Sequence, residues 1–282
     1  MSAEPRDRRA AQPPEIEVPV RRVGEGPGAA GEDRVVVEEP LEVRVAGRSL
    51  LVTMRTPGSD ADLVRGLLFT EGIVEDPADI GGIAHCDDVP AEARGNVVLV
   101  SLAPGARLVE ENALRAGLVS SACGVCGKST LEAVRQASPP VERGPRLTRA
   151  LVAGLPAALR GGQALFERTG GLHAAALFAA DGRRLALAED VGRHNAVDKV
   201  IGEALRFLPL PLRDTLLVVS GRAGFEIVQK ARRAGIPVVC SVSAPSSLAI
   251  QVARDGGQTL VGFLREGRFN VYCGEERFDP AL

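Results

Sequence analysis

The sequence is poor in aromatic side chains. Its 282 residues include no Trp and one Tyr, and aromatic residues make up 3% of the chain. Exposed rings on which single-stranded nucleic acids could stack are therefore scarce. The net charge of −2 also argues against a general nucleic-acid binder. We expect a core of Ala, Val and Leu, and no nucleic-acid partner.

Long apolar runs and a secretory cysteine pattern are also missing. No run of about 18 apolar residues, the length that a membrane-spanning helix requires, is present. Arg8 and Arg9 are followed by no apolar segment of the kind found in export signals. The five cysteines are odd in number and irregularly spaced, unlike a disulfide framework. We expect a cytoplasmic protein without membrane contact, in which Cys240 and Cys273 are buried and unreactive.

The remaining composition, 45% hydrophobic and 25% charged, is that of a globular chain. Residues 1–32 are rich in Pro, Arg, Glu, Gly and Ala without periodicity, which predicts a disordered tail. A run of prolines and glycines over residues 138–145 marks a domain boundary. It separates a smaller, strand-rich α+β domain over residues 33–140 from a second domain over residues 141–282.

The first domain shows short strands and two helix signals. Alternating apolar residues predict a hairpin over residues 35–52. Asp60 is expected to cap a helix that ends before Gly72. Residues 96–102 predict another strand, and a capping-box sequence predicts a short helix over residues 130–137.

The second domain alternates helices with strongly apolar strands. This order predicts a three-layer α/β domain whose sheet is covered on both faces. Residues 215–220 form a near-continuous apolar run, as expected of a central strand. The other predicted elements are helices at 148–160, 193–206, 223–234 and 245–254, and strands at 174–178, 185–188, 237–241, 259–264 and 269–273.

Two thiols three residues apart, Cys123 and Cys126, lie in a glycine-rich segment, residues 120–128, which we call the thiol loop. Structural zinc needs four ligands, and only two are local here. A zinc deaminase needs Glu where Ala175 stands. Disulfide exchange and sulfur carriage both stay open, because each needs a thiolate of lowered pKa. Lys128 and the predicted helix start at Thr130 would lower that pKa.

Lysine is also rare. The 34 basic residues include only three lysines, Lys128, Lys199 and Lys230. An ammonium is compact and strongly hydrated, whereas a guanidinium is planar. Either chance or a need for a compact cation explains these three positions.

A third polar cluster spans residues 189–199, where a predicted strand meets a predicted helix. Such junctions are where α/β sheets bind ligands. The candidates for contact with a nucleobase edge are Asn195 and Asp198, and the candidates for phosphate are Arg193, His194 and Lys199. A solvated, charged helix start is the alternative.

Two further strand-to-helix loops have sequences suited to anions. Ser220, Gly221 and Arg222 follow the central strand and open a helix, where backbone N–H groups are free. Ser243 lies in a similar loop after the next strand. If these loops meet at one sheet edge, they form a single phosphate-binding crevice. His173 is either part of that site or a satisfied core histidine.

As a set, these motifs resemble the FdhD family, the formate dehydrogenase accessory sulfurtransferases. The resemblance runs from about residue 33 to the C-terminus, in the family's order. The segments that carry it are residues 120–128, 166–173, 189–199, 220–222, 243–249 and 262–265.

The resemblance implies that Cys123 accepts sulfur from a cysteine desulfurase as a persulfide, with Cys126 as its companion. The sulfur then passes to the molybdenum or tungsten of a bis-molybdopterin guanine dinucleotide cofactor, which the catalytic subunit of formate dehydrogenase needs. The resemblance also implies a homodimer and a zinc-free, cytidine-deaminase-like second domain. It assigns the guanine nucleotides to Phe263, Leu264, Arg265, Glu266, Gly267 and Arg268. A non-catalytic carrier or chaperone of the cofactor is the alternative.

Overall fold

The computed structural model describes residues 12–24, 26–110, 112–113, 139–265 and 267–279. Cys123, Cys126, Lys128, Glu266 and the helix predicted over residues 130–137 lie outside these ranges. In the described part of the chain, no helix is both long and apolar enough to cross a membrane.

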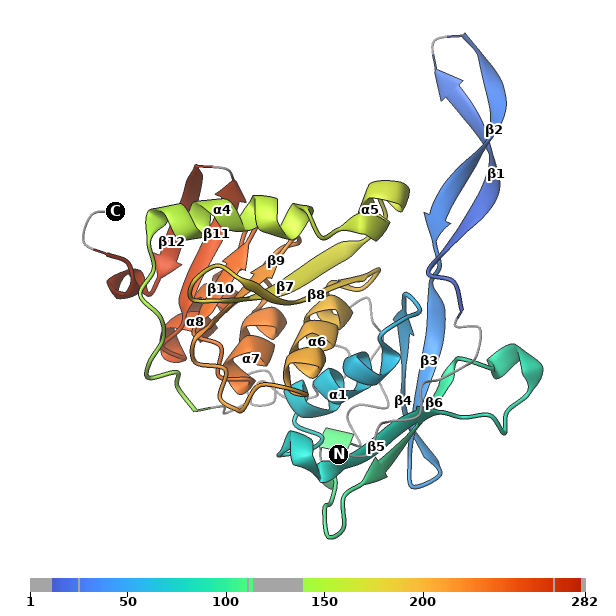
Figure 1. Ribbon diagram of the computed structural model, residues 1–282, viewed down its shortest axis with the longest axis horizontal. Helices are drawn as coiled ribbons and strands as arrows, with labels where there is room; N and C mark the ends of the chain where they lie inside the picture. Colours follow the sequence, from blue (N-terminus) through green and yellow to red (C-terminus); the bar gives the residue numbers. More distant parts are fainter. Residues whose placement is uncertain (1–11, 25, 111, 114–138, 266, 280–282) are drawn as a thin grey trace.

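A six-stranded sheet forms the C-terminal part, in the strand order β12-β11-β10-β9-β7-β8 (Figure 1). Three neighbouring strands are parallel: β9 (Thr215–Val219), β10 (Val238–Ser241) and β11 (Thr259–Arg265). The others run antiparallel to a neighbour: β7 (His173–Ala179), β8 (Arg184–Asp190) and β12 (Arg268–Cys273).

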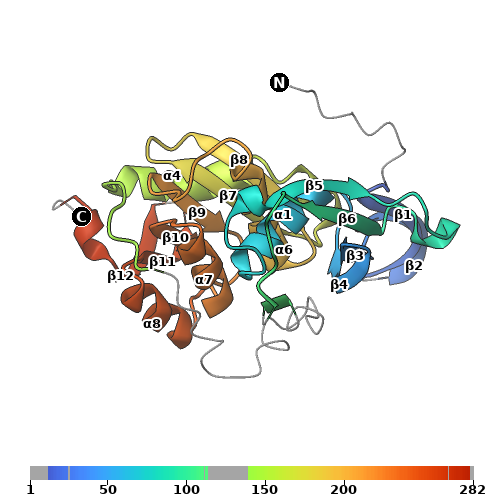
Figure 2. The same ribbon diagram turned by 90° about the horizontal axis from the view of Figure 1, so that it is seen from below.

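Helices cover both faces of this sheet (Figures 1 and 2). On one face lie α6 (Arg193–Ala204), α7 (Phe225–Arg233) and α8 (Ser247–Asp255), and on the other lies α4 (Arg149–Arg160), followed by the short α5 (Ala164–Thr169). Alternate strand residues serve the two faces: Leu217 packs with α6 and α7, whereas Leu216 packs with α4. The predicted three-layer α/β arrangement is confirmed.

The N-terminal part is a four-stranded sheet, in the order β4-β3-β6-β5, packed on one helix. The predicted hairpin is formed by β3 (Glu39–Val45) and β4 (Arg48–Arg55), with Ala46 and Gly47 at positive φ in the turn. The remaining elements are α1 (Asp60–Thr70), β5 (Ile80–His85), β6 (Val97–Leu102) and the 3₁₀ turns Pro77–Asp79, Ala91–Ala93 and, near the C-terminus, Glu275–Arg277.

Asp60 begins α1 but does not cap it. Ser59 stands at the cap position, with a φ of 55° and no side-chain bond to the helix. The Asp60 carboxylate instead accepts hydrogen bonds from Arg55 Nε at 3.0 Å and Nη2 at 3.1 Å. The capping prediction was wrong, because the fully buried Arg55 requires a carboxylate partner.

Residues 15–24 and 26–36 form a two-stranded ribbon that stands away from the body (Figure 1). Its strands, β1 (Glu15–Gly24) and β2 (Gly26–Val36), pair antiparallel, and Arg34 bonds Glu17 across them at 3.2 Å. The prediction of disorder was wrong for residues 15–24 and 26–32. Charged and apolar residues alternate over residues 15–18 with the period of a strand. Pro, Gly and Ala in the neighbouring positions interrupt this alternation, so the strand pattern is hard to recognise from the sequence.

The two parts meet where α1 crosses α6. A Cβ added at Gly66 would lie 1.9 Å from the carbonyl oxygen of Asp198, and one added at Gly202 would lie 1.9 Å from that of Asp62. The helix backbones are therefore in direct contact. One hydrophobic cluster runs through this crossing, from Leu63 of α1 to Val197 of α6. Residues 33–140 and 141–282, predicted as two domains, share this core.

Gly66→Ala should lower the free energy of unfolding by about 3 kcal/mol, because the added methyl group must separate the helices. Urea unfolding followed by circular dichroism measures this change. Gly154→Ala within α4 is the control: no atom lies within 4 Å of its Cβ position. That control should gain about 0.5 to 1 kcal/mol from helix propensity. Equal effects of the two substitutions would contradict the close crossing.

Candidate functional site

The loops predicted to bind a ligand lie at one edge of the six-stranded sheet. Cα register pairs His173 with Asp190 and Ala175 with Val219, so β7 begins where β8 and β9 end. β10 and β11 are parallel to β9 and end at the same edge. These loops therefore meet at one edge, which is the condition that a single crevice requires.

Serine side chains fix these loops to one another. Ser241 Oγ lies within hydrogen-bond distance of the carbonyl oxygens of Gly221, at 2.8 Å, and Ser243, at 2.9 Å, and its one proton can be donated to either. Ser220 Oγ accepts from the backbone N–H of Ala174 at 2.8 Å. The edge is therefore held in shape by bonds within the protein.

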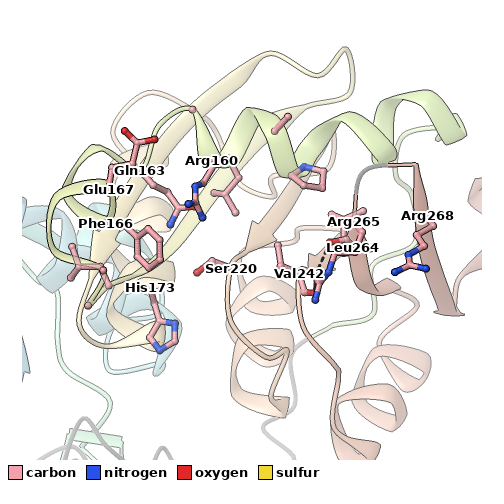
Figure 3. A pocket seen from close by; sticks show the side chains of 17 residues that line it. Arg160, Gln163, Phe166, Glu167, His173, Ser220, Val242, Leu264, Arg265 and Arg268 are labelled. Atoms are coloured by element: carbon pink, nitrogen blue, oxygen red, sulfur yellow. Dashed lines mark hydrogen bonds between the residues drawn. The ribbon is translucent and has the colours of Figure 1, made fainter. Parts of the chain in front are cut away.

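A cavity of about 1200 Å³ opens over this edge, beneath the end of α4 and α5 (Figure 3). Typical small-molecule sites occupy about 300 to 1,000 Å³, so a large ligand fits here. Four of the predicted site residues line it: Ser220, Leu264, Arg265 and Arg268. His173 lines it as well, which favours the site over the core for this residue.

Three guanidinium groups belong to the cavity lining. Arg160 lies over the ring of Phe166, with 5.0 Å from Cζ to the ring centroid. Arg265 donates to the carbonyl oxygens of Leu264, at 3.1 Å, and of Val242. Arg268 comes from the neighbouring strand β12 (Figure 3). Guanidinium groups match phosphate geometry, so the cavity is suited to an anion.

The α4–α5 side of the cavity was not singled out from sequence spacing. Arg160, Gln163, Phe166 and Glu167 all line it. Only the glycines that follow α5 indicated a loop of interest, and Phe166 and Glu167 entered solely through the family resemblance. Glu167 is the one acidic residue among the lining residues.

Asn195 and Lys199, predicted to contact a nucleotide, instead face the N-terminal part. Asn195 Nδ2 donates to the carbonyl oxygen of Met54 at 2.7 Å. Lys199 Nζ lies 2.7 Å from Asp190 Oδ2 and donates to the carbonyl oxygen of Thr56 at 2.9 Å. Both side chains are buried, and their partners in the N-terminal part are Met54 of β4 and Thr56, which follows β4.

Asp198, the third such residue, forms a second buried ion pair with Lys230 of α7. Lys230 Nζ donates to both Asp198 oxygens, at 2.8 Å and 3.0 Å, and lies 2.7 Å from Glu71. Burial raises the pKa of Asp198 to about 6, and Lys230 offsets part of that rise. Burial alone would lower the pKa of Lys230, but Asp198 and Glu71 raise it above 10.5. We take the pair as charged at neutral pH, because Lys230 bonds both oxygens.

The two lysines that the structure describes, Lys199 and Lys230, are thus both buried in ion pairs. Their relative exposures are 3% and 4%. Each ammonium reaches oxygens of two different elements with a single nitrogen atom. These contacts favour a need for a compact cation over chance at both positions.

Two histidines beside the sheet edge are held neutral at pH 7. Burial, followed by the nearby Arg193, lowers the pKa of His173. Burial, followed by Lys230 and Arg193, lowers the pKa of His194 to about 3. His194 Nε2 is 3.9 Å from a carboxylate oxygen of Glu226, beyond hydrogen-bond distance.

Several predicted residues are not part of the cavity lining: Arg193, His194, Gly221, Arg222, Ser243, Phe263 and Gly267. Phe263 is notable among them because its φ is 51°, a strained value for a residue other than glycine. Its ring is 45% exposed, and its N–H donates to the carbonyl oxygen of Ser243 at 3.0 Å.

The other thiols are structural. Cys240 and Cys273 are buried, as predicted, and burial raises the pKa of both, to about 12 for Cys240. Within the described ranges, no group of three His, Cys, Asp or Glu side chains could hold a metal ion.

The segment that carries Cys123 and Cys126 is anchored at both ends near α1 and α7. Before it, Asn112 Nδ2 donates to the carbonyl oxygen of Gly72 at 2.8 Å. After it, the carbonyl oxygen of Pro139 accepts from Arg232 Nε at 3.3 Å. The described residues that flank this segment therefore lie near α1 and α7.

Comparison with known proteins decides the family. The model of the FdhD/NarQ family matches residues 36–279. The chain belongs to the FdhD/NarQ family. The sulfur carrier protein FdhD of Streptomyces coelicolor is 48% identical over 267 residues, which cover 92% of this chain and 93% of that protein. The sulfur carrier protein FdhD of Anaeromyxobacter dehalogenans is 52% identical over 259 residues, covering 89% and 90%.

A solved structure agrees with this FdhD/NarQ assignment at the level of the fold. The crystal structure of a formate dehydrogenase accessory protein from Desulfotalea psychrophila superposes with a TM-score of 0.73. The match covers 95% of this chain and 100% of that one, at 24% identity. The family resemblance and the mixed α/β class read from the sequence are confirmed.

Acid should destabilise this FdhD/NarQ protein through His194. Its folded pKa of about 3 lies below the ordinary 6.5, so the unfolded chain binds more protons between these values. The contribution of His194 to stability should therefore fall by about 2 kcal/mol between pH 7 and pH 5, and the raised pKa of Asp198, which acts in the opposite direction, offsets part of this loss. Urea unfolding at both pH values measures this loss, and His194→Gln should lose about 2 kcal/mol less. The same pH dependence in parent and variant would exclude this role of His194.

Proposed function

We propose that this chain is a sulfur carrier for formate dehydrogenase maturation. Cys123 takes sulfur from a cysteine desulfurase and passes it to the metal of a bis-molybdopterin guanine dinucleotide cofactor. The observation that carries the proposal is about 50% identity to proteins named sulfur carrier protein FdhD, over roughly nine-tenths of both chains. The arginine-lined cavity supports it.

The first transfer needs only a thiolate. The Cys123 thiolate attacks the terminal sulfur of the desulfurase persulfide, a new S–S bond forms, and the desulfurase thiolate leaves. Electrons balance without an outside oxidant. Lys128 and the helix start expected at Thr130 favour the thiolate of Cys123 at neutral pH.

The second transfer needs two electrons if the sulfur reaches the metal as sulfide. The Cys126 thiolate can supply them by attacking Cys123 Sγ, which releases the terminal sulfur as hydrosulfide. This step leaves a disulfide between Cys123 and Cys126. A cellular dithiol reductant then restores both thiols.

The cavity suits the cofactor by size and charge. Arg265 and Arg268 lie at one end and would hold phosphate groups. Glu167 and Gln163 lie at the other end, beside the ring of Phe166 (Figure 3). A carboxylate there can accept the two N–H groups on the edge of guanine, while the ring offers a stacking surface.

The implied partners are a cysteine desulfurase, the catalytic subunit of formate dehydrogenase and a second copy of the chain. Two other functions account for parts of the same structure. A carrier that only shields the cofactor needs the cavity but no reactive thiol. A thiol–disulfide exchanger needs the thiols but no cavity.

Cys123→Ala should abolish sulfur loading and leave the cavity intact. After incubation with a cysteine desulfurase and cysteine, the parent chain should gain the mass of one sulfur atom, and the variant none. Cys86→Ala is the matched control and should load like the parent. Mass spectrometry of the intact chain and titration with GDP measure the two properties. Unimpaired cofactor maturation by Cys123→Ala would favour the shielding function.

Arg268→Ala should weaken GDP binding by about 10- to 100-fold, because a charge-assisted bond to phosphate is lost. Isothermal titration calorimetry measures the affinity. Arg183→Ala is the control, since this exposed arginine lies in the β7–β8 turn, outside the cavity lining. If both variants bound GDP as the parent does, the nucleotide site would have to lie elsewhere.

A further inference from the structure

The helix α5 forms one wall of the cavity without a buried side chain of its own. It is six residues long, and none of these described residues is buried. Glycine pairs at 161–162 and 170–171 flank it on both sides. A helix of this length is unstable in isolation. Contacts with other elements must therefore hold α5 where Phe166 and Glu167 line the cavity (Figure 3).

The first of these contacts comes from Glu189 of β8. Its Oε2 accepts from the backbone N–H of Leu165 at 2.9 Å, and its Oε1 accepts from that of Phe166 at 2.7 Å. Both N–H groups lie in the first turn of α5, where a helix supplies no acceptor of its own. Bonds to an ionised acceptor are strong. Glu189 is paired with Ala174 of β7, so its carboxylate ties the beginning of α5 to the six-stranded sheet.

The second contact comes from the base of the β1–β2 ribbon. Arg168 Nε, near the end of α5, donates to the two carboxylate oxygens of Glu15 at 2.8 Å and 2.9 Å. Val36 Cγ1 of the ribbon lies 3.1 Å from the Cβ position of Gly171. The side chains of Glu15 and Arg168 are 21% and 40% exposed, so water screens part of their attraction. The ribbon therefore holds the end of α5, more weakly than Glu189 holds its beginning.

We propose that Glu189 and the Glu15–Arg168 pair are positioning residues for the base of the bound nucleotide. None of the three is among the described residues that line the cavity, so they act through α5, which carries Glu167. The inference rests on the proposed function, which assigns guanine to this end of the cavity and phosphates to the arginine end. A displaced α5 weakens contacts with the base and leaves contacts with phosphate unchanged. The two ends can therefore be probed separately.

Calorimetric titration of the full chain with GDP, ADP and inorganic pyrophosphate tests the proposal. The parent should prefer GDP, because adenine lacks the two N–H groups that Glu167 would accept. Glu189→Gln should weaken GDP binding about tenfold and reduce this preference, because an amide loses one of the two charge-assisted bonds. Its affinity for pyrophosphate should stay that of the parent. Asp181→Asn is the matched control: its carboxylate accepts from the backbone N–H of Arg183 in a turn outside the cavity lining.

Charge reversal tests the contact with the ribbon. Glu15→Arg and Arg168→Glu should each weaken GDP binding about threefold, because the pair is partly exposed to water. The double variant restores opposite charges and should regain the preference of the parent for GDP. Glu17→Arg makes the same charge change at a residue that bonds Arg34 within the ribbon, and should leave the preference unchanged.

Hydrogen exchange of the free chain gives a second readout that needs no nucleotide. The amides of Leu165 and Phe166 should exchange about tenfold faster in Glu189→Gln, because their acceptor is weakened. The amides of the central strand β9 should stay as protected as in the parent. Faster exchange in β9 as well would mean that the substitution destabilises the whole fold.

Three results would overturn these positioning roles. If Glu189→Gln and both single reversals kept the full preference for GDP, the roles would be excluded and the nucleotide site would stand. Equal losses of GDP and pyrophosphate affinity would also exclude them, because the effect would not be confined to the base. A parent chain that binds ADP as tightly as GDP would contradict the proposed base site, and the positioning roles with it. Sulfur loading of Cys123 is measured separately and tests the sulfur-carrier function alone.

Discussion

The crossing of α1 and α6 is the contact on which the rest of the structure depends. Gly66 and Gly202 let the two helix backbones touch, with no side chain between them. This approach brings the buried Lys199–Asp190 and Lys230–Asp198 pairs within reach of groups from the N-terminal part. A shift between the parts would break the bonds from Lys199 to Thr56 and from Lys230 to Thr70, and buried polar groups left without partners are costly.

The same contact fixes the loop that follows β8. Asp190 ends β8, accepts from the backbone N–H of Thr56 at 3.2 Å and from that of Gly192 at 2.8 Å, and pairs with Lys199. These bonds fix the loop after β8 to the N-terminal part. The loops after β9 and β10 are held together by Ser241, and Ser220 and Val242 from these loops line the cavity. The carboxylates of residues 189–199 stabilise the fold, whereas arginines of other elements line the cavity.

Much of the fold follows from local patterns. Apolar periodicity predicted the strands and helices of the C-terminal part, and the parallel order placed their loops at one edge, because each pattern is set by neighbouring residues. The ribbon and Asp60 were mispredicted for related reasons. Glycine and proline interrupt the alternation of charged and apolar residues in β1 and β2, so the strand pattern is hard to recognise. The Asp60 carboxylate pairs with the buried Arg55, because an unpaired buried charge costs more free energy than an uncapped helix end.

By itself, the sequence determined the family, the α/β class and the common edge of the strand-to-helix loops, since these rest on motifs and on short-range periodicity. Only the tertiary structure decided what Asn195, Asp198 and Lys199 do. Polar residues at a helix start give the same sequence pattern whether their side chains contact a ligand or another helix. The partners of Asn195 and Lys199 lie 141 and 143 residues away in the chain, so only the folded arrangement of α1 against α6 reveals them.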